Sequence, residues 1–362
     1  MQKLLGIVNN FFESVFLVFT QRKYALLFIA YAVGRVFVDS YFTAIAKNDV
    51  TSMVDQLLNA FKKLVKELQW MDEATKTRAL EKAENMWKNI GYPDFIKDNA
   101  LLDKYYNLLS PEIKENEPFY RVNSVVQEWM MSLQMNDLTK PFNRKSFGGS
   151  PAIVNAWYSN LKNSITFPAG ILQFPFFDAT YPKAVNYGAI GSVIGHEITH
   201  GFDDQGSQYN ASGDLQNWWS ESSALHFDKK TQCMKEQYDH YCYPQLNKCV
   251  QGDTTLGENI ADNGGLKEAF TAYQTYVAEH GEELRLPSLA EYSMDQIFFI
   301  SFASFWCGSY KDNFLRNLLS TNEHAPNEFR VKGVVQNSKE FAEAFNCPLG
   351  SPMNPEHKCT VW

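Results

Sequence analysis

The chain has 362 residues and a formal net charge of −8, and hydrophobic residues make up 45% of it. This composition supports a packed core in one large or two ordinary domains and excludes an intrinsically disordered chain. Because the Lys and Arg residues form no basic stripe, the sequence also argues against nucleic acid as a partner.

The N-terminal part, up to about residue 118, is predicted to be largely helical. It starts with two apolar runs, residues 11–19 and 24–33, which Gln21-Arg22-Lys23 separates. Neither run reaches the length of about 20 residues that a membrane-spanning helix needs. Neither has the clean apolar stretch and small-residue cleavage site of a signal peptide. Buried core helices are therefore favoured, with a broken membrane anchor as the alternative.

Two helices are predicted to follow. Residues 50–70 carry apolar side chains at helical spacing. Asp72 can cap the second helix, whose polar stretch would run from Glu73 to Asn89 and stop at Gly91-Tyr92-Pro93.

The composition changes near residue 118, so we expect one domain in residues 1–118 and another in residues 119–362. In the second domain, residues 164–168 read as a strand closed by Pro168. A helix should start near Asn186, and most of the remaining chain is predicted to be helical. The expected fold class is therefore mainly α with a small β-sheet.

The most informative motif lies on the helix after Asn186 and reads His196-Glu197-Ile198-Thr199-His200. Residues four apart share one face of a helix, so His196 and His200 can offer two imidazoles to one cation. Glu197 can hold a metal-bound water without binding the metal itself. A chance match on a surface helix is the alternative, but the apolar flank at residues 189–194 indicates a buried helix.

A catalytic zinc ion usually takes three protein ligands and leaves a fourth position for water. Glu258, at the start of a further predicted helix, is the best candidate for the third ligand. Asp262 lies four residues on, and Asp203 lies three residues after His200, so each could accept a hydrogen bond from a ligand imidazole. The alternative is that these acids merely stabilise the N-termini of helices.

All six cysteines lie after residue 232. Their even number and the sequon Asn210-Ala211-Ser212 favour an oxidising compartment, with six reduced thiols as the alternative. Cys242 and Cys249 flank a short loop containing proline, so a local disulfide is plausible. Since no Cys-x-x-Cys motif is present, a structural zinc site built from thiolates is not expected.

Several segments together resemble the neprilysin and endothelin-converting-enzyme family of zinc metallopeptidases. The resemblance runs from about residue 20 to the end of the chain and keeps the family's order. It implies a thermolysin-like zincin catalytic domain in residues 119–362 and part of the family's helical lid domain in residues 1–118. The matching segments are residues 154–158, 167–172, 195–204, 257–265, 305–310, 329–333 and 359–362.

The resemblance also implies roles for residues outside the zinc motif. Asn155 and the backbone of Ala156 would hold the main chain of the substrate. His324 would stabilise the oxyanion, and Arg330 would bind a peptide carbonyl. Asp262 is described in this family as a proton donor, whereas its chemistry favours an orienting carboxylate that stays ionised.

Phe176, Val193 and Trp306 are apolar candidates for the pocket that receives the side chain after the cleaved bond. Core packing would explain these residues equally well. Without the resemblance, His324 would be read as a loop histidine and Arg330 as a surface cation.

The resemblance further implies that Cys233 and Cys359 form a disulfide. Cys307 and Cys347 match family positions whose partners lie in a part of the family sequence that this chain does not contain, so they are expected to be free thiols. Family ectodomains are about twice as long and follow a membrane anchor. We therefore expect a fragment of a longer product, without the first part of the lid domain.

The resulting prediction is a zinc-dependent endopeptidase with one Zn2+ per chain. It would hydrolyse oligopeptides on the amino side of large hydrophobic residues, with a zinc-bound water and Glu197 as general base. A truncated, non-catalytic form that binds zinc or peptide is the alternative from another class. By resemblance, the expected location is the extracellular face of the plasma membrane or the secreted fraction. The sequence makes no prediction of oligomeric state.

Overall fold

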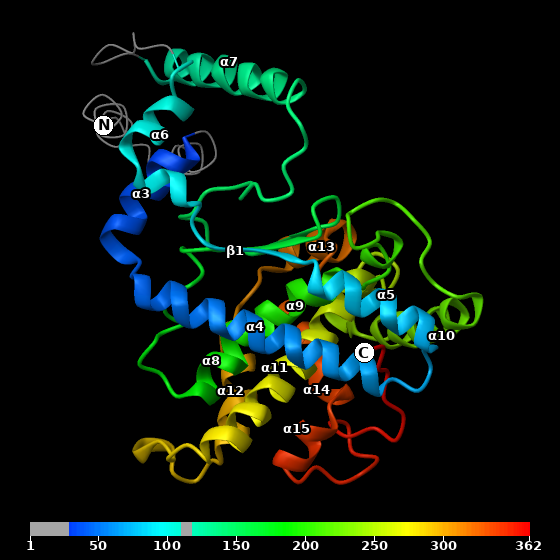
Figure 1. Ribbon diagram of the computed structural model, residues 1–362. Helices are drawn as coiled ribbons and strands as arrows, with labels where there is room; N and C mark the ends of the chain where they lie inside the picture. Colours follow the sequence, from blue (N-terminus) through cyan, green and yellow to red (C-terminus); the bar gives the residue numbers. More distant parts are fainter. Residues whose placement is uncertain (1–28, 110–117) are drawn as a thin grey trace. The chain divides into compact units, whose positions relative to one another are not determined.

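The computed structural model describes residues 29–109 and 118–362 (Figure 1). The chain divides into two compact units, each built from several sequence segments. The expected boundary at residue 118 falls inside the first unit. It separates two domains of the family and not two compact units, so it stays a prediction. Among the described residues, the first unit comprises residues 29–48, 88–109, 118–156 and 166–173, and the second comprises residues 49–87, 157–165 and 174–362.

The first unit holds a small aromatic core. The rings of Tyr105 and Tyr106 pack on Trp129, with centroids 5.8 and 5.0 Å away. The hydroxyl of Tyr106 accepts a hydrogen bond from the backbone N–H of Ala32 at 3.1 Å, which ties the helices together. The elements that lie wholly in this unit are α3 (Ala30–Tyr41), η1 (Asp94–Lys97), α6 (Asn99–Tyr105) and α7 (Phe119–Asp137).

The apolar run at residues 11–19 lies outside the described residues, and the run at 24–33 is described only from Ile29. No helix in the described part of the chain is long and apolar enough to span a membrane.

The second unit is mainly helical, which confirms the expected fold class. It includes almost all of α4 (Ala44–Glu67), followed by α5 (Glu73–Glu84), α8 (Lys183–Asn186), the π-helical turn η2 (Tyr187–Gly191), α9 (Ser192–His200), η3 (Gly206–Gln208), α10 (Glu221–Asp239), η4 (Pro244–Leu246), α11 (Leu256–His280), η5 (Pro287–Leu289), α12 (Met294–Phe305), α13 (Asp312–Thr321), α14 (Asn327–Asn337) and α15 (Lys339–Ala344).

The β-structure is small. Three strands form one sheet in the order β1-β3-β2, and two more form an antiparallel pair in which Cys242 lies opposite Cys249. The strand expected at residues 164–168 is present with those bounds and is buried throughout. The strands are β1 (Trp87–Gly91), β2 (Trp157–Ser159), β3 (Ser164–Pro168), β4 (Cys242–Tyr243) and β5 (Lys248–Cys249).

The end of the helix after Asp72 differs from the prediction. Asp72 caps α5 as expected, because its carboxylate accepts the backbone N–H groups of Ala74 and Thr75. However, α5 stops at Glu84 instead of Asn89, and residues 87–91 form β1. The pairing of these residues in the sheet, together with burial of Ile90, outweighs the helical pattern of Glu and Lys.

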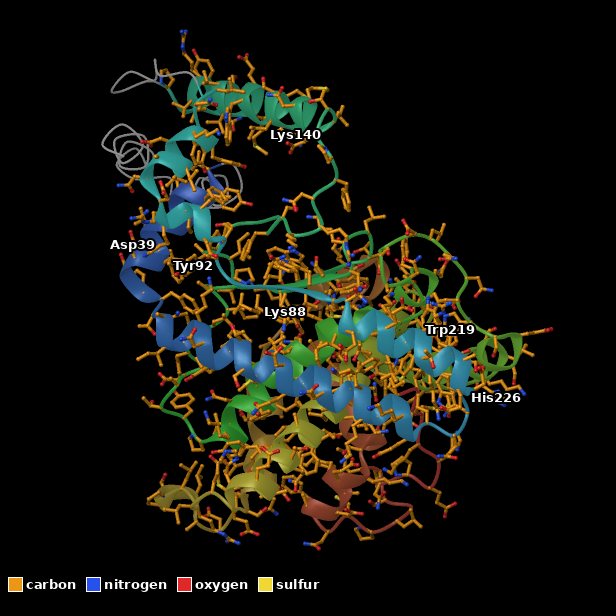
Figure 2. The ribbon with its side chains drawn as sticks, viewed as in Figure 1. Asp39, Lys88, Tyr92, Lys140, Trp219 and His226 are labelled. Carbon is orange, nitrogen blue, oxygen red and sulfur yellow. A yellow bond between two sulfur atoms is a disulfide. The ribbon has the colours of Figure 1, made fainter. Side chains whose placement is uncertain are left out.

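Asp39, Lys140 and His226, labelled in Figure 2, are examples of exposed charged or polar side chains. Exposed pairs of this kind, such as Lys140 with Asp137 at 2.9 Å, contribute little to stability.

The helices α9 and α11 pack against each other in the second unit (Figure 1). A Cβ atom on Gly195 would lie 2.6 Å from the carbonyl oxygen of Gly265, and one on Gly265 would lie 2.4 Å from the nitrogen of His196. The two backbones therefore meet directly, which only glycine permits. This close approach places the first turn of α11 beside the histidines of α9.

A fully buried carboxyl group supports this helix pair. Thr199 has one hydroxyl proton, yet its Oγ1 lies 2.8 Å from the carbonyl of Gly195 and 2.7 Å from Oε1 of Glu268. Burial raises the pKa of Glu268 well above its usual range. A neutral Glu268 can donate from Oε1 to Thr199 while Thr199 donates to Gly195, so both contacts of the Thr199 hydroxyl are satisfied.

Candidate metal centre and active site

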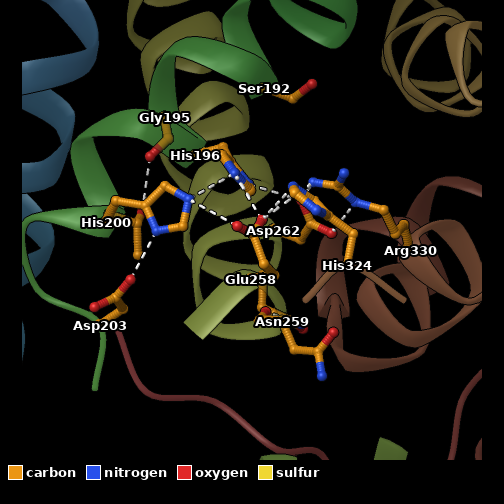
Figure 3. A network of polar contacts seen from close by, with 12 residues as sticks. Ser192, Gly195, His196, His200, Asp203, Glu258, Asn259, Asp262, His324 and Arg330 are labelled. Carbon is orange, nitrogen blue, oxygen red and sulfur yellow. Dashed lines mark hydrogen bonds and ion pairs between the residues drawn. The ribbon is translucent and has the colours of Figure 1, made fainter. Parts of the chain in front are cut away.

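The three expected metal ligands converge in the second unit (Figure 3). His196 and His200 come from α9, and Glu258 comes from the first turn of α11. Nε2 of His196 lies 3.2 Å from Oε2 of Glu258, and Nε2 of His200 lies 3.6 Å from Oε1. The two Nε2 atoms are 2.9 Å apart.

The outer nitrogens of both imidazoles are held by carboxylates. Nδ1 of His196 lies 2.8 Å from Oδ1 of Asp262, and Nδ1 of His200 lies 2.7 Å from Oδ2 of Asp203. A carboxylate can only accept, so each Nδ1 carries a proton and donates it. The lone pairs of both Nε2 atoms therefore point toward each other and toward Glu258.

This arrangement requires a cation. Two nitrogen lone pairs and a carboxylate repel one another at these distances unless a proton or a metal ion lies between them. Burial lowers the pKa of His196, but hydrogen bonds to Asp262 and Glu258 outweigh it and raise the pKa to about 10. Two imidazoles and one carboxylate are a common donor set for catalytic zinc, so these residues fit a zinc ion.

Asp203 is itself fixed by the loop after α9. Its second oxygen, Oδ1, accepts the backbone N–H groups of Gln205 at 2.8 Å and Gly206 at 2.6 Å. The carboxylate therefore cannot rotate freely, and it holds the His200 ring in one orientation.

Asp262 has a second partner that sequence reasoning missed. Arg330 donates from Nε to Oδ2 at 2.7 Å and from Nη2 to Oδ1 at 2.6 Å. These donors lie on the edge of the planar guanidinium, and one of its faces packs on the Trp306 ring, with the guanidinium carbon 3.9 Å from the ring centroid. Burial raises the pKa of Asp262, but Arg330 and His196 lower it to about 2. An ionised Asp262 supports the orienting role over that of proton donor.

Replacing Asp262 by Asn is expected to lower the free energy of unfolding by about 3–5 kcal/mol, because it removes the bidentate counter-charge of the buried Arg330 guanidinium and leaves only Glu258, 3.9 Å from Nη2. Urea denaturation measures this loss. Glu328→Gln is a matched control, since it breaks the exposed Glu328–Lys332 pair on the same helix as Arg330 and should cost less than about 1 kcal/mol. Equal effects of the two changes would contradict the prediction.

Glu197 follows His196 on α9 and is almost fully buried, and the charges of His196, His200 and Glu258 affect its pKa. Within the described ranges, its Oε2 atom has no hydrogen-bond partner. Burial raises the pKa of Glu197, although both histidines oppose this. A buried carboxylate with one free oxygen is suited to accept a proton from water.

His324 reaches the centre from the loop between α13 and α14. Its Nε2 lies 3.0 Å from Oε2 of Glu258, and its side chain is 38% exposed. Glu258, Glu323 and His324 form a second group that could hold a metal ion, but Glu323 is exposed. His324 therefore lies at the open side of the centre, next to the buried ligand set.

The other predicted binding residues are divided between the two units. Asn155 is exposed and Ala156 is buried, and both belong to the first unit. Val193 and Phe176 are half-buried in the second unit. The ring of Phe176 packs on that of Phe305, with centroids 5.6 Å apart, so core packing accounts for its position. Their binding roles stay predictions.

Both expected disulfides are present in the structure. Cys233 is bonded to Cys359 and Cys242 to Cys249. Cys307, which is exposed, and Cys347, which is half-buried, are free thiols. Two disulfides in one unit are typical of a protein that folds in an oxidising compartment.

Burial and the neighbouring Asp203 raise the pKa of Asp204 to about 6. An acid whose pKa is higher in the folded state destabilises the fold progressively as the pH rises from about 4 to 6. We expect Asp204→Asn to raise the free energy of unfolding by about 1 kcal/mol at pH 7, since the group is only partly buried, and to have no effect near pH 4. Urea denaturation at both pH values tests this. A gain of equal size at pH 4 and 7 would rule out titration as its cause.

A mainly helical fold, in which one helix presents two histidines four residues apart and a later helix adds a carboxylate, defines a zincin-type protein. Sequence comparison gives the family. A family model described as "Peptidase family M13" matches residues 155–361, and a second with the same description matches residues 23–93. The chain belongs to peptidase family M13.

The similar proteins are consistent with this membership. Neprilysin-11 of Caenorhabditis elegans is 54% identical over 331 residues, which are 91% of this chain and 39% of the relative. Human neprilysin is 44% identical over 336 residues, 91% of this chain and 44% of the relative. The chain thus spans less than half the length of these curated relatives.

Solved structures agree on the fold. The inhibitor complex of Mycobacterium tuberculosis zinc metalloprotease ZMP1 matches with a TM-score of 0.83 and 33% identity, over 94% of this chain and 50% of that one. A structure titled "Haemonchus galactose containing glycoprotein complex" matches with a TM-score of 0.83 and 34% identity, over 94% of this chain and 54% of that one.

Proposed function

We propose that this chain carries the catalytic centre of a zinc-dependent endopeptidase that hydrolyses oligopeptides. The observation that carries the proposal is the donor set itself. His196, His200 and Glu258 converge, a carboxylate orients each imidazole, and Glu197, whose pKa these three residues affect, has a buried oxygen without a hydrogen-bond partner. Membership of a peptidase family and relatives named neprilysin and endothelin-converting enzyme support peptides as the substrate.

A zinc ion held by His196, His200 and Glu258 would polarise the scissile carbonyl and lower the pKa of water toward neutrality. Glu197 would accept the proton that water gives up on attack and pass it to the nitrogen of the leaving amine. Burial raises the pKa of Glu197 and so brings it closer to neutral pH, where one group can act both as general base and as general acid.

His324 and Arg330 would act on the substrate's oxygens. His324 is the more accessible group, and its imidazole N–H could stabilise the negative charge that develops on the scissile carbonyl. Arg330 uses Nε and one hydrogen of Nη2 for Asp262, so a peptide carbonyl would be bound by its remaining N–H groups. Asn155 and Ala156 would hold the main chain of the peptide.

We further propose cleavage before large hydrophobic residues, with Phe176, Val193 and Trp306 as candidates for the pocket, and a location outside the cell. The two disulfides support an oxidising compartment. The competing function is binding of zinc or peptide without turnover. The complete donor set together with Glu197 favours the enzyme.

Hydrolysis of a short quenched peptide with an aromatic residue after the scissile bond tests the proposal. We expect activity that disappears on dialysis against a zinc chelator and returns when Zn2+ is added in equimolar amount, because the zinc ion would lower the pKa of the water from which Glu197 takes a proton. Activity that survives removal of zinc, as measured by metal analysis of the same sample, would refute the zinc mechanism. A protein that binds zinc but never cleaves the peptide would instead support the binding form.

A further inference from the structure

Lys82 is a buried lysine in the polar helix that the sequence predicts after Asp72. It lies on α5, and its side chain is almost completely buried, with an exposed fraction of 1%. Its Nζ donates hydrogen bonds to the carbonyl oxygens of Gly206 at 2.6 Å and Tyr209 at 2.7 Å. The described residues place no carboxylate at ion-pair distance from it. A buried amino group is costly, so its retention calls for a reason.

Both acceptors lie in the loop that follows the metal-binding helix. The backbone of Gly206 is held on both sides of its Cα atom. Its N–H donates to Oδ1 of Asp203 at 2.6 Å, and its carbonyl accepts from Lys82. The other oxygen of Asp203 accepts from Nδ1 of His200 at 2.7 Å. A continuous chain of hydrogen bonds therefore connects Lys82 to a candidate metal ligand.

The position of this loop depends on Gly206. A Cβ atom on Gly206 would lie 1.9 Å from the carbonyl oxygen of His200, so only glycine allows the loop to fold back on the end of α9. Asn163 adds a second tie, since its Nδ2 donates to the carbonyls of Lys82 and Ala211 at 3.0 Å each. The loop is therefore anchored to α5 at several points, with the amino group of Lys82 at the centre.

We propose that Lys82 is a positioning residue that fixes the carboxylate of Asp203 and, through it, the His200 imidazole for metal binding. This inference rests on the proposed function. Burial lowers the pKa of Lys82 to about 7, and the Asp203 carboxylate partly opposes this. Because a neutral amine still has two N–H groups for two carbonyls, the anchor persists in either charge state.

The test compares Lys82→Met with Lys76→Met on the same helix. Lys76 is also buried, with 8% exposed, and its Nζ also donates to a backbone carbonyl, that of Lys66 at 3.2 Å, but it has no link to Asp203. We expect Lys82→Met to raise the zinc dissociation constant, measured by competition with a chromogenic chelator, by about 10–100-fold, as loss of an orienting partner does. Lys76→Met should leave it within about twofold. Equal zinc affinities of the two variants would overturn the proposal.

Thermal denaturation of the metal-free proteins separates this effect from a general loss of stability. If Lys82→Met does not fold, Lys82→Arg is measured in the same way, since it keeps N–H donors but misplaces them on a longer side chain. Wild-type zinc affinity in folded Lys82→Arg together with wild-type kcat would count against positioning.

In the zinc-loaded, active protein we expect Lys82→Met to lower kcat and to leave KM unchanged. A wild-type chain that binds no zinc would refute the proposed function, whereas tight zinc binding by both wild type and Lys82→Met would refute only this inference.

Discussion

Replacing Glu197 by Gln is expected to lower kcat for peptide hydrolysis by about 100- to 10,000-fold, the contribution of a general base. Gln has the same shape as Glu but cannot accept the proton from water. The zinc content should stay at the wild-type level, because Glu197 does not belong to the three converging donors. Steady-state kinetics and metal analysis of the same preparation measure both quantities.

Glu268→Gln is the matched control for this change. Glu268 is also a buried glutamate next to α9, but it contacts Thr199 and not the donor set. Because burial raises the pKa of Glu268 well above its usual range and so favours the neutral carboxyl, an amide can replace its donor function, and we expect activity near the wild-type value. If Glu197→Gln and Glu268→Gln lower kcat equally, the effect would come from packing, and Glu197 would lose its assigned role.

Replacing Glu258 by Ala is expected to weaken zinc binding by more than the 10- to 100-fold that loss of an orienting partner costs, and to abolish hydrolysis. Glu258 provides the only carboxylate among the three donors. Burial raises its pKa, but the neighbouring histidines lower it far below the usual range, so it is fully charged. Removing it takes away a ligand and leaves the Nε2 atoms of His196 and His200 without the carboxylate that faces both of them.

Glu323→Ala tests the competing metal group on the other side of His324. Glu323 is exposed and belongs only to the set of Glu258, Glu323 and His324. We expect wild-type zinc affinity and activity for this variant. A loss of zinc binding in Glu323→Ala that matched the loss in Glu258→Ala would move the metal site away from His196 and His200. Isothermal titration with Zn2+ distinguishes the two cases.

Much of the fold could be predicted because local sequence patterns determine many of its elements. The cap at Asp72, the strand at residues 164–168 and the mainly helical class all follow from short-range propensities and spacing. The prediction failed at Trp87–Gly91, where a polar helical pattern becomes a strand. That strand depends on a partner about 80 residues away in the chain, which no local pattern reveals.

At the candidate site, too, the features that depend on distant segments were missed. The pairing of Arg330 with Asp262, the stacking of Arg330 on Trp306 and the burial of Lys82 were not foreseen. Sequence spacing alone describes Arg330 and Lys82 as surface cations. The Gly264-Gly265 pair was visible in the sequence, and its link to Gly195 could have been suspected only from the need for two backbones to meet.

The sequence by itself determined the metal-binding pair, because the 3.6-residue period of a helix places His196 and His200 on one face whatever surrounds them. It also determined which further residue types could complete the centre. Only the tertiary structure decided how those groups meet. The contact of α9 with α11 through glycine brings Glu258 to the histidines, Asp262 and Asp203 select their tautomers, and Arg330 and Lys82 fix those acids. The physical reason is that burial and hydrogen bonding between distant segments set the charge and the orientation of these side chains. The local spacing of residues in the sequence predicts neither.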